Sequence, residues 1–178
     1  MRELILGGVR SGKSRHAEQR ASKLSDDVVY IATAQAREDA GMAERIAAHQ
    51  ARRPAHWRTV EAPLDLARAI ESHDAPGRVL LIDCLTLWLT NRLVAADEAA
   101  DAPPADDGLE SARDELLDAV TAARGHLLLV SNETGLGVMP MNALARRFCD
   151  EAGALHQRMA ERCEHVTWMV AGLAQPLK

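Results

Sequence analysis

A short glycine-containing segment near the N-terminus places the strongest constraint on the fold. Residues 7–14 read Gly-Gly-Val-Arg-Ser-Gly-Lys-Ser and match G-x-x-x-x-G-K-[ST], the Walker A pattern. The apolar stretch Glu3–Leu6 precedes the pattern, and the amphipathic stretch Lys13–Leu24 follows it. Glycines in such a loop let backbone N–H groups turn toward phosphate oxygens. A strand, a loop and a helix in this order therefore predict a nucleotide-binding protein of the α/β class.

Two side chains of this loop are suited to phosphate chemistry. Lys13 supplies a positive charge to the β- and γ-phosphates, and the Ser14 hydroxyl is a ligand for Mg²⁺. Such a site needs a second carboxylate at the end of a neighbouring strand. The apolar run Val79–Ile82 is followed by Asp83, so we expect Ser14 to bind the metal and Asp83 to bind it through water. Glu133 follows another apolar run, and its role as a base, a substrate contact or a loop acid stays open.

Apolar runs of strand length alternate with amphipathic stretches along the chain. Most of the runs are continuous, as in strands buried on both faces of a parallel sheet. The alternation predicts βαβ crossovers and a three-layer α/β fold with a mainly parallel central sheet. The expected strands are Glu3–Leu6, Val28–Ala32, Trp57–Val60, Val79–Ile82, Leu127–Val130 and Val166–Val170. The expected helices are Lys13–Leu24, Ala40–Arg53, Leu64–Ser72, Leu85–Ala95, Leu109–Ala123 and Asn142–Arg162.

The 178 residues are expected to form a single domain, residues 1–178. Residues 95–108 are acidic, rich in Ala and Pro and poor in large apolar side chains, so we predict a flexible loop there. The cysteines Cys84, Cys149 and Cys163 lack CxxC or Cys/His ligand spacing, which argues against a disulfide framework and a structural zinc site.

Charge and hydropathy exclude two further classes. The formal net charge of −5 argues against a globally basic nucleic-acid-binding protein. No apolar run approaches the roughly 20 residues that a membrane-spanning helix needs. The glycine loop also follows the N-terminus too closely to leave room for a signal peptide. We therefore expect a cytoplasmic protein without an integral membrane segment.

The phosphate loop identifies a nucleotide site but not a reaction. A regulatory GTPase carries an Asn-Lys-x-Asp motif, which this sequence lacks. A DNA-associated ATPase usually has a basic face, which the net charge does not support. A small-molecule kinase fits a compact acidic domain, and a non-enzymatic regulatory protein controlled by nucleotide stays open as an alternative.

One expected helix places a histidine among arginines. Arg45, His49 and Arg52 are spaced i, i+4 and i+7 on the stretch Ala40–Arg53, with Arg53 adjacent. Nearby positive charge disfavours imidazolium, so the His49 ring would keep a nucleophilic lone pair, and the arginines could bind a triphosphate. The same spacing also fits a half-exposed surface helix with a structural histidine, and spacing alone favours that interpretation.

Taken together, these motifs resemble the bifunctional adenosylcobinamide kinase / adenosylcobinamide-phosphate guanylyltransferase family of cobalamin biosynthesis. The resemblance covers nearly the whole chain in order. Its blocks are residues 7–18, 30–34, 45–49, 53–61, 81–86, 130–137 and 142–148, continuing to Gly153. It implies a kinase that phosphorylates the aminopropanol hydroxyl of adenosylcobinamide with ATP or GTP. It also implies transfer of GMP from GTP to that phosphate through a histidine–GMP intermediate, giving adenosylcobinamide-GDP and pyrophosphate.

The resemblance implies a role for individual residues as well. It assigns the GMP-carrying histidine to His49. From the chemistry of the phosphate loop, we expect Lys13 to stabilise the charge on the departing pyrophosphate. It also implies a RecA-like P-loop fold and a homotrimer. The Mg²⁺ dependence that we expect follows from the phosphate loop itself. The acidic segment 95–108 has no fixed counterpart in the family pattern, so the corrinoid-binding loops stay unassigned. The implied nucleotide contacts are Gly7, Gly8, Val9, Arg10, Ser11, Gly12, Lys13, Ser14, Ala32, Thr33, Ala34, Gln50, Ala51, Arg52, Arg53, Glu61 and Asp83.

Overall fold

A computed structural model describes residues 1–34, 53–98 and 108–178. Residues 35–52, which include His49 and most of the expected helix Ala40–Arg53, lie outside the described residues. Residues 99–107, the larger part of the acidic segment, lie outside them too. Within the described ranges, no helix is both long and apolar enough to cross a bilayer.

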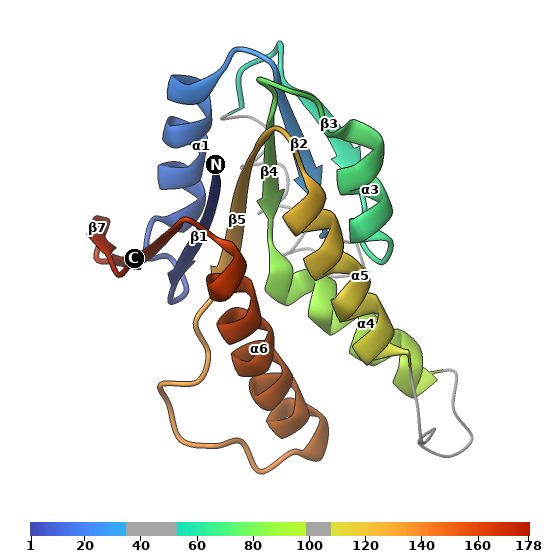
Figure 1. The fold of residues 1–178 in the computed structure, drawn as a ribbon. Coiled ribbons are helices and arrows are strands. Elements are labelled where there is room, and N and C mark those ends of the chain that lie inside the picture. Colours follow the sequence, from blue (N-terminus) through green and yellow to red (C-terminus); the bar gives the residue numbers. More distant parts are fainter. Residues whose placement is uncertain (35–52, 99–107) are drawn as a thin grey trace.

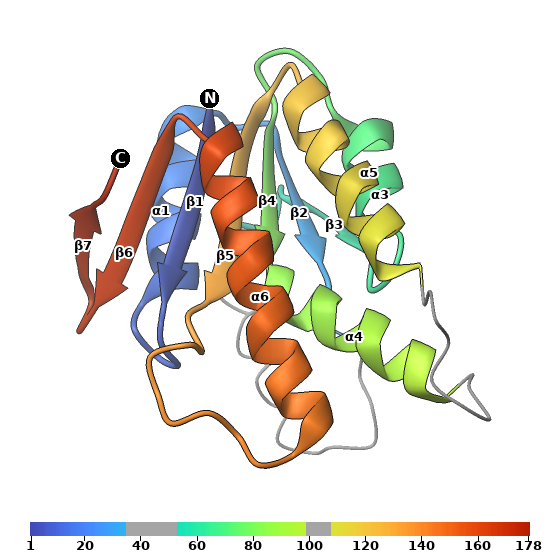
Figure 2. The same cartoon turned by 60° about the horizontal axis from the view of Figure 1, so that its bottom comes forward.

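The described residues include seven strands that form one sheet with the order β3-β2-β4-β5-β1-β6-β7. Among the strands that the structure describes, β1 to β6 run parallel to one another, and β7 alone is antiparallel, pairing with β6 (Figure 2). The sheet is therefore mainly parallel, as the continuous apolar runs predict. The strands are β1 Arg2–Gly7, β2 Val28–Ala32, β3 Arg58–Glu61, β4 Val79–Asp83, β5 His126–Asn132, β6 His165–Val170 and β7 Leu173–Pro176.

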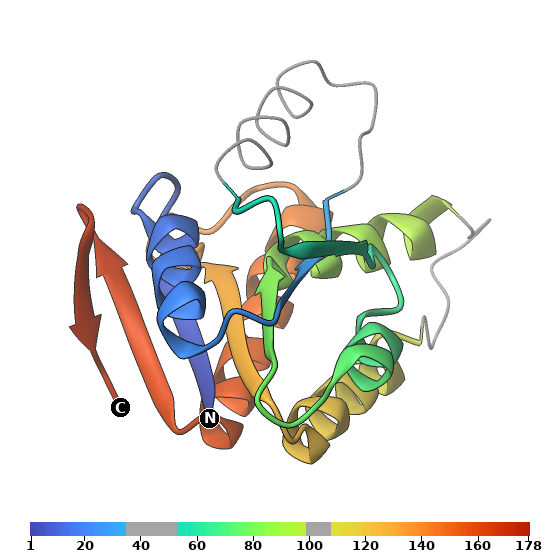
Figure 3. The same ribbon diagram turned by 90° about the horizontal axis from the view of Figure 1, so that it is seen from above.

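Helices cover both faces of the sheet, which completes the three predicted layers. Helix α1 packs on one face, and the other described helices pack on the opposite face (Figures 1 and 3). These are α1 Lys13–Leu24, α3 Leu66–His73, α4 Leu85–Glu98, α5 Leu109–Ala122 and α6 Ala143–Arg162.

Alternate residues of the central strands belong to two separate cores. In β4, Leu80 and Ile82 join the core beneath α3 to α6, whereas Val79 and Leu81 join the core beneath α1. Both sets are fully buried, since successive side chains of a strand point to opposite faces. A strand that is buried on both sides must be apolar throughout, which explains the unbroken run at residues 79–82.

The observed elements follow the expected ones closely, with two differences. Helix α4 continues to Glu98, so the first residues of the acidic segment belong to a helix. Strand β7 was not expected from the sequence. It follows a tight turn in which Ala171 and Gly172 both have positive φ, the geometry of a type I′ hairpin turn.

Candidate functional site

The parallel strands bring the predicted site residues to a single edge of the sheet. Gly7 ends β1, Ala32 ends β2, Glu61 ends β3 and Asp83 ends β4. In register, Ala32 lies between Asp83 on one side and Glu61 on the other. Ligands of open α/β sheets bind at the carboxyl ends of the strands. The strand arrows of β1 to β5 all point to this edge (Figure 2).

Between β1 and α1, the loop folds around its own lysine. The Nζ of Lys13 donates a hydrogen bond to the carbonyl oxygen of Gly8 over 2.8 Å. Only 8% of Lys13 is exposed. Burial lowers the pKa of Lys13, and the nearby Cys84 and Asp83 oppose that shift. The ammonium group therefore sits inside the loop, where a phosphate would meet it.

The backbone of the loop is fixed by close packing on the β6–β7 turn. Gly172 N donates to Ser11 O over 2.9 Å. A Cβ at Gly7 would lie 2.6 Å from both Met169 O and Ser11 Oγ, so only glycine fits there. Gly12 has a φ of 99° and caps the start of α1, a conformation that favours glycine.

A buried polar atom of the loop indicates whether a phosphate group fits there. The Oγ of Ser11 is buried and has no hydrogen-bond partner among the described residues. A buried hydroxyl without a partner costs free energy, and a bound phosphate oxygen or an ordered water would remove that cost. A Cβ at Gly8 meets nothing within 4 Å, so the loop is open on that side. The loop therefore fits a phosphate group.

Asp83 is anchored from the neighbouring strand. The Tyr30 hydroxyl donates to Asp83 Oδ2 over 2.9 Å. Burial, together with the negative charge of Asp83, raises the pKa of Tyr30, so its hydroxyl keeps its proton near neutral pH. The side chain of Thr33 fixes the next residue, because its hydroxyl donates to Cys84 O over 2.7 Å and accepts from Cys84 N over 2.8 Å. Tyr30 thus holds the carboxylate, and Thr33 holds the backbone of the residue that follows it.

The donor set suits Mg²⁺ better than a transition metal. Asp83 and Ser14 offer oxygen ligands, which Mg²⁺ prefers. Among the described residues, no group of three or more His, Cys, Asp or Glu side chains could bind a metal by itself. Mg²⁺ usually binds through one or two protein oxygens plus substrate phosphates and water, so a sparse set is what a nucleotide-bound metal needs.

The remaining predicted nucleotide contacts are placed in part. Arg53 lies with its guanidinium carbon 3.4 Å above the centre of the Tyr30 ring, a cation–π contact. Glu61 is exposed at the end of β3. Thr33 is fully buried, and its hydroxyl donates to Cys84 O, directly after β4. Gln50, Ala51 and Arg52 lie outside the described residues, as does His49.

Glu133 lies beside the loop, next to the end of β1. Its backbone N–H donates to Gly7 O over 3.0 Å, and its Oε1 accepts from Gly135 N over 2.7 Å. Two residues earlier, the Ser131 hydroxyl pairs with His156 Nε2 at 2.7 Å. The side chain of Glu133 therefore takes part in the turn after β5, which leaves its chemical role a prediction.

Two features of the site had no prediction from the sequence. Tyr30 carries the hydrogen bond to Asp83, and the β6–β7 turn supports the loop through Gly172. Gly172, two residues after the apolar strand β6, was the available signal for the turn, since hairpin turns favour glycine. The family block at residues 30–34 begins with Tyr30, but no sequence pattern gave that residue a role, because it reads as one more apolar residue of a buried strand.

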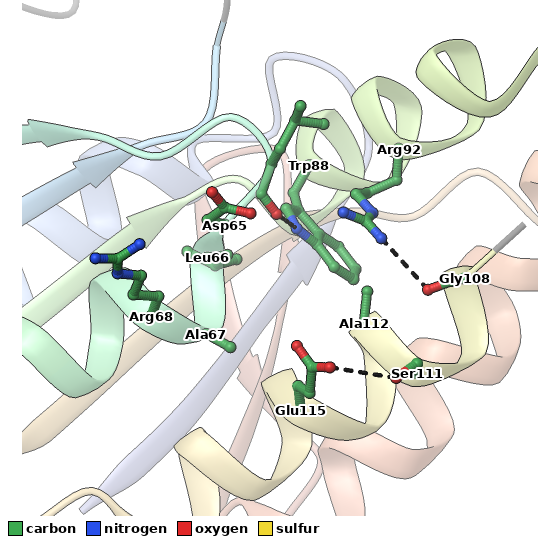
Figure 4. A pocket seen from close by; sticks show the side chains of 11 residues that line it. Asp65, Leu66, Ala67, Arg68, Trp88, Arg92, Gly108, Ser111, Ala112 and Glu115 are labelled. Atoms are coloured by element: carbon green, nitrogen blue, oxygen red, sulfur yellow. Dashed lines mark hydrogen bonds between the residues drawn. The ribbon is translucent and has the colours of Figure 1, made fainter. Parts of the chain in front are cut away.

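A separate cavity of about 480 Å³ lies between α3, α4 and α5 (Figure 4). Some of its polar groups bond to the protein: Trp88 Nε1 donates to Leu64 O, and Arg92 donates to Gly108 O. Neither Lys13 nor Asp83 lines it. The cavity is therefore distinct from the phosphate loop and is not part of the candidate site.

The mainly parallel sheet, the loop between β1 and α1, the buried Lys13 and the acidic end of β4 define a P-loop α/β protein. The likeness extends to solved structures of low sequence identity. One of them is a prototypical ATPase from the type III secretion system of pathogenic bacteria, with a TM-score of 0.57 and 12% identity. That match covers 98% of this chain and 56% of the ATPase, and it indicates the shared fold alone.

The sequence comparisons are more specific. The chain belongs to the cobinamide kinase / cobinamide phosphate guanyltransferase family, whose family model matches residues 3–177. The bifunctional adenosylcobalamin biosynthesis protein CobP of Pseudomonas aeruginosa is 56% identical over 178 residues, covering 100% of this chain and 98% of the relative. The CobU proteins of Salmonella typhimurium and Escherichia coli are 40% and 38% identical, with 98% of each chain covered. The family resemblance inferred from the motifs is thereby confirmed.

Proposed function

We propose that this protein phosphorylates adenosylcobinamide with ATP or GTP and then transfers GMP from GTP to the product. The observation that carries the proposal is the meeting of the buried Lys13 and the Asp83 carboxylate at one edge of the sheet. A nucleoside triphosphate bound to residues 7–14 would have its phosphates beside the Lys13 ammonium and the Asp83 carboxylate. Membership of the cobinamide kinase / cobinamide phosphate guanyltransferase family supports the substrate class.

In the kinase step, the substrate hydroxyl attacks the γ-phosphorus of the nucleotide. The bond between the γ-phosphorus and the bridging oxygen breaks, and the nucleoside diphosphate leaves. Lys13 stabilises the charge that develops on the phosphate oxygens. The base that accepts the hydroxyl proton stays open between Glu133 and Asp83.

In the guanylyl step, a ring nitrogen of His49 attacks the α-phosphorus of GTP and pyrophosphate leaves. The phosphate of adenosylcobinamide phosphate then attacks the histidine-bound GMP. The P–N bond breaks, and its electron pair returns to the imidazole. Two steps avoid a direct encounter between two polyanions, which is an advantage of covalent catalysis.

The metal and the assembly are also part of the proposal. Ser14 and, through water, Asp83 would bind Mg²⁺, which when bound neutralises charge on the nucleotide phosphates. We further propose that residues 1–178 form a single cytoplasmic nucleotide-binding domain and that the protein assembles as a homotrimer.

The test is to incubate the purified protein with Mg²⁺ and GTP labelled in the α-phosphate. The wild type is expected to gain a GMP adduct that is labile in acid and stable in base. A His49→Ala variant should lose the adduct yet keep its kinase activity with adenosylcobinamide. A His56→Ala variant, which removes an exposed histidine beyond the expected helix Ala40–Arg53, serves as the matched control and should still be labelled. Labelling of a histidine in His49→Ala would disprove the assignment.

A further inference from the structure

Tyr30 contacts two groups of the candidate site at once. It is the third residue of β2 and only 2% exposed. Its hydroxyl donates to Asp83 Oδ2 over 2.9 Å, and the Arg53 guanidinium lies 3.4 Å above its ring. One side chain thus links the carboxyl end of β4 to the first described residue after the segment that carries His49.

A tyrosine at this position needs an explanation. The other buried residues of β2 are aliphatic, and the core beneath α1 requires only an apolar side chain. A buried hydroxyl is costly unless it is hydrogen-bonded, and here its acceptor is a carboxylate. The strong bond constrains Oδ2 of Asp83 and therefore the rotation of the whole carboxylate group.

The ring has a second role that the hydroxyl does not provide. A guanidinium stacked on an aromatic face is attracted to it and loses rotational freedom. Among the described residues, the Nε of Arg53 has no hydrogen-bond partner, and Nη1 reaches Thr59 Oγ1 at 3.3 Å. The stacking therefore presents a fixed cation at the site, with donor capacity left for a ligand.

We propose that Tyr30 is a positioning residue that orients Asp83 for metal binding and Arg53 for nucleotide binding. The inference rests on the proposed function, in which those two residues contact Mg²⁺ and the nucleotide. Tyr30 itself does not touch the substrate. It acts through the two side chains on either side, so its hydroxyl and its ring should make separable contributions.

The experiment measures the affinity for a fluorescent GTP analogue with an α,β-methylene bridge, which cannot transfer GMP. Each variant is titrated once with Mg²⁺ and once with EDTA. The EDTA value reports nucleotide contacts, and the factor by which Mg²⁺ tightens binding reports the metal site through linkage. Neither readout depends on turnover.

Tyr30→Phe keeps the ring and removes the hydroxyl. We expect the gain from Mg²⁺ to fall about 10-fold, as for other partners that orient a metal ligand, with the EDTA value within about twofold of wild type. Tyr30→Leu should weaken the EDTA value as well, because the support for Arg53 is lost. Asp83→Asn is the reference and should remove most of the gain.

The matched control is Thr167→Val. The Thr167 hydroxyl donates to the buried carboxylate of Glu3 over 2.8 Å, so this variant also loses a buried hydroxyl-to-carboxylate bond. Thr167→Val should leave unchanged both the affinity in EDTA and the factor by which Mg²⁺ tightens binding. If Thr167→Val lost as much as Tyr30→Phe, the effect of Tyr30→Phe would be a general loss of stability and not a change at the metal site. A normal gain in Tyr30→Phe, with the gain lost in Asp83→Asn, overturns the inference alone. A normal gain in Asp83→Asn overturns the metal role in the proposed function as well.

Discussion

The ammonium group of Lys13 and the carbonyl oxygen of Gly8 are joined by a hydrogen bond of 2.8 Å that crosses the loop between β1 and α1. The lysine is nearly buried, and that burial lowers its pKa. The loop thus keeps a cation in a place where its charge is disfavoured. A nucleotide phosphate brings negative charge to that place, so nucleotide binding and the charge on Lys13 should stabilise each other.

This arrangement predicts opposite effects of Lys13→Met on activity and stability. Without the cation, the rates of both phosphoryl and guanylyl transfer should fall by about 100-fold or more. The free energy of unfolding should stay the same or rise, because replacing a buried charge with an apolar side chain removes a desolvation cost. Initial rates and urea denaturation measure the two effects.

Lys23→Met is the control for this substitution. Lys23 is exposed in the last turn of the same helix, so the change in charge and side-chain type is matched while the loop stays intact. It should leave both rates unchanged. A Lys13→Met protein that retained its activity within a few-fold would show that the buried ammonium has no part in the reaction.

A second prediction concerns pH and the buried pair of Ser131 and His156. Burial lowers the pKa of His156, and Glu133 opposes the shift more weakly. Between this lowered value and the ordinary value of 6.5, the unfolded chain binds more protons than the folded protein. The free energy of unfolding should therefore decrease as the pH falls below about 6.5.

The variant His156→Gln removes the titrating ring and leaves an amide that can still bond to Ser131. Its free energy of unfolding, followed by urea denaturation from about pH 7.5 to about pH 5, should vary less with pH than that of the wild type. His73, half-buried at the end of α3, also has a lowered pKa. His73→Gln should flatten the pH profile of the free energy of unfolding less than His156→Gln does, because less of the His73 side chain is buried on folding. An unchanged profile in His156→Gln would contradict the prediction.

Local patterns predicted most of the fold. The bounds of β2 and α1 are the expected ones, since an unbroken apolar run and an amphipathic stretch both reflect burial. Strand β7 was missed because Leu173–Pro176 is exposed along its whole length and ends in a proline. An edge strand of this kind has no hydrophobic pattern, and its pairing with β6 depends on the turn at Ala171 and Gly172.

The site was predictable only where it follows from strand ends. Parallel pairing brings the loop after β1 and Asp83 to a common edge, so the sequence could indicate both. The bond between Tyr30 and Asp83 joins residues 53 positions apart. It depends on β2 lying beside β4, an order that no local pattern records. The support of Ser11 by Gly172 is non-local in the same way.

The last prediction compares the same substitution at two glycines. At Gly7 a new Cβ would lie 2.6 Å from Met169 O, and this backbone atom cannot move away without a cost in free energy. Gly7→Ala should therefore lower the free energy of unfolding by about 1–3 kcal/mol, the usual cost of overpacking. Gly153 lies inside α6, where a Cβ meets nothing within 4 Å.

Gly153→Ala should instead raise the free energy of unfolding by about 0.5–1 kcal/mol, because alanine loses less backbone entropy in a helix. Urea denaturation of the two variants measures both values under identical conditions. Gly7→Ala should also weaken nucleotide binding, since Ser11 Oγ must move from the new methyl group and the loop moves with it. Gly153→Ala should bind nucleotide as the wild type does. Equal stability of the two variants would mean that the loop can relax around a side chain at Gly7, and that close packing on Met169 does not fix its shape.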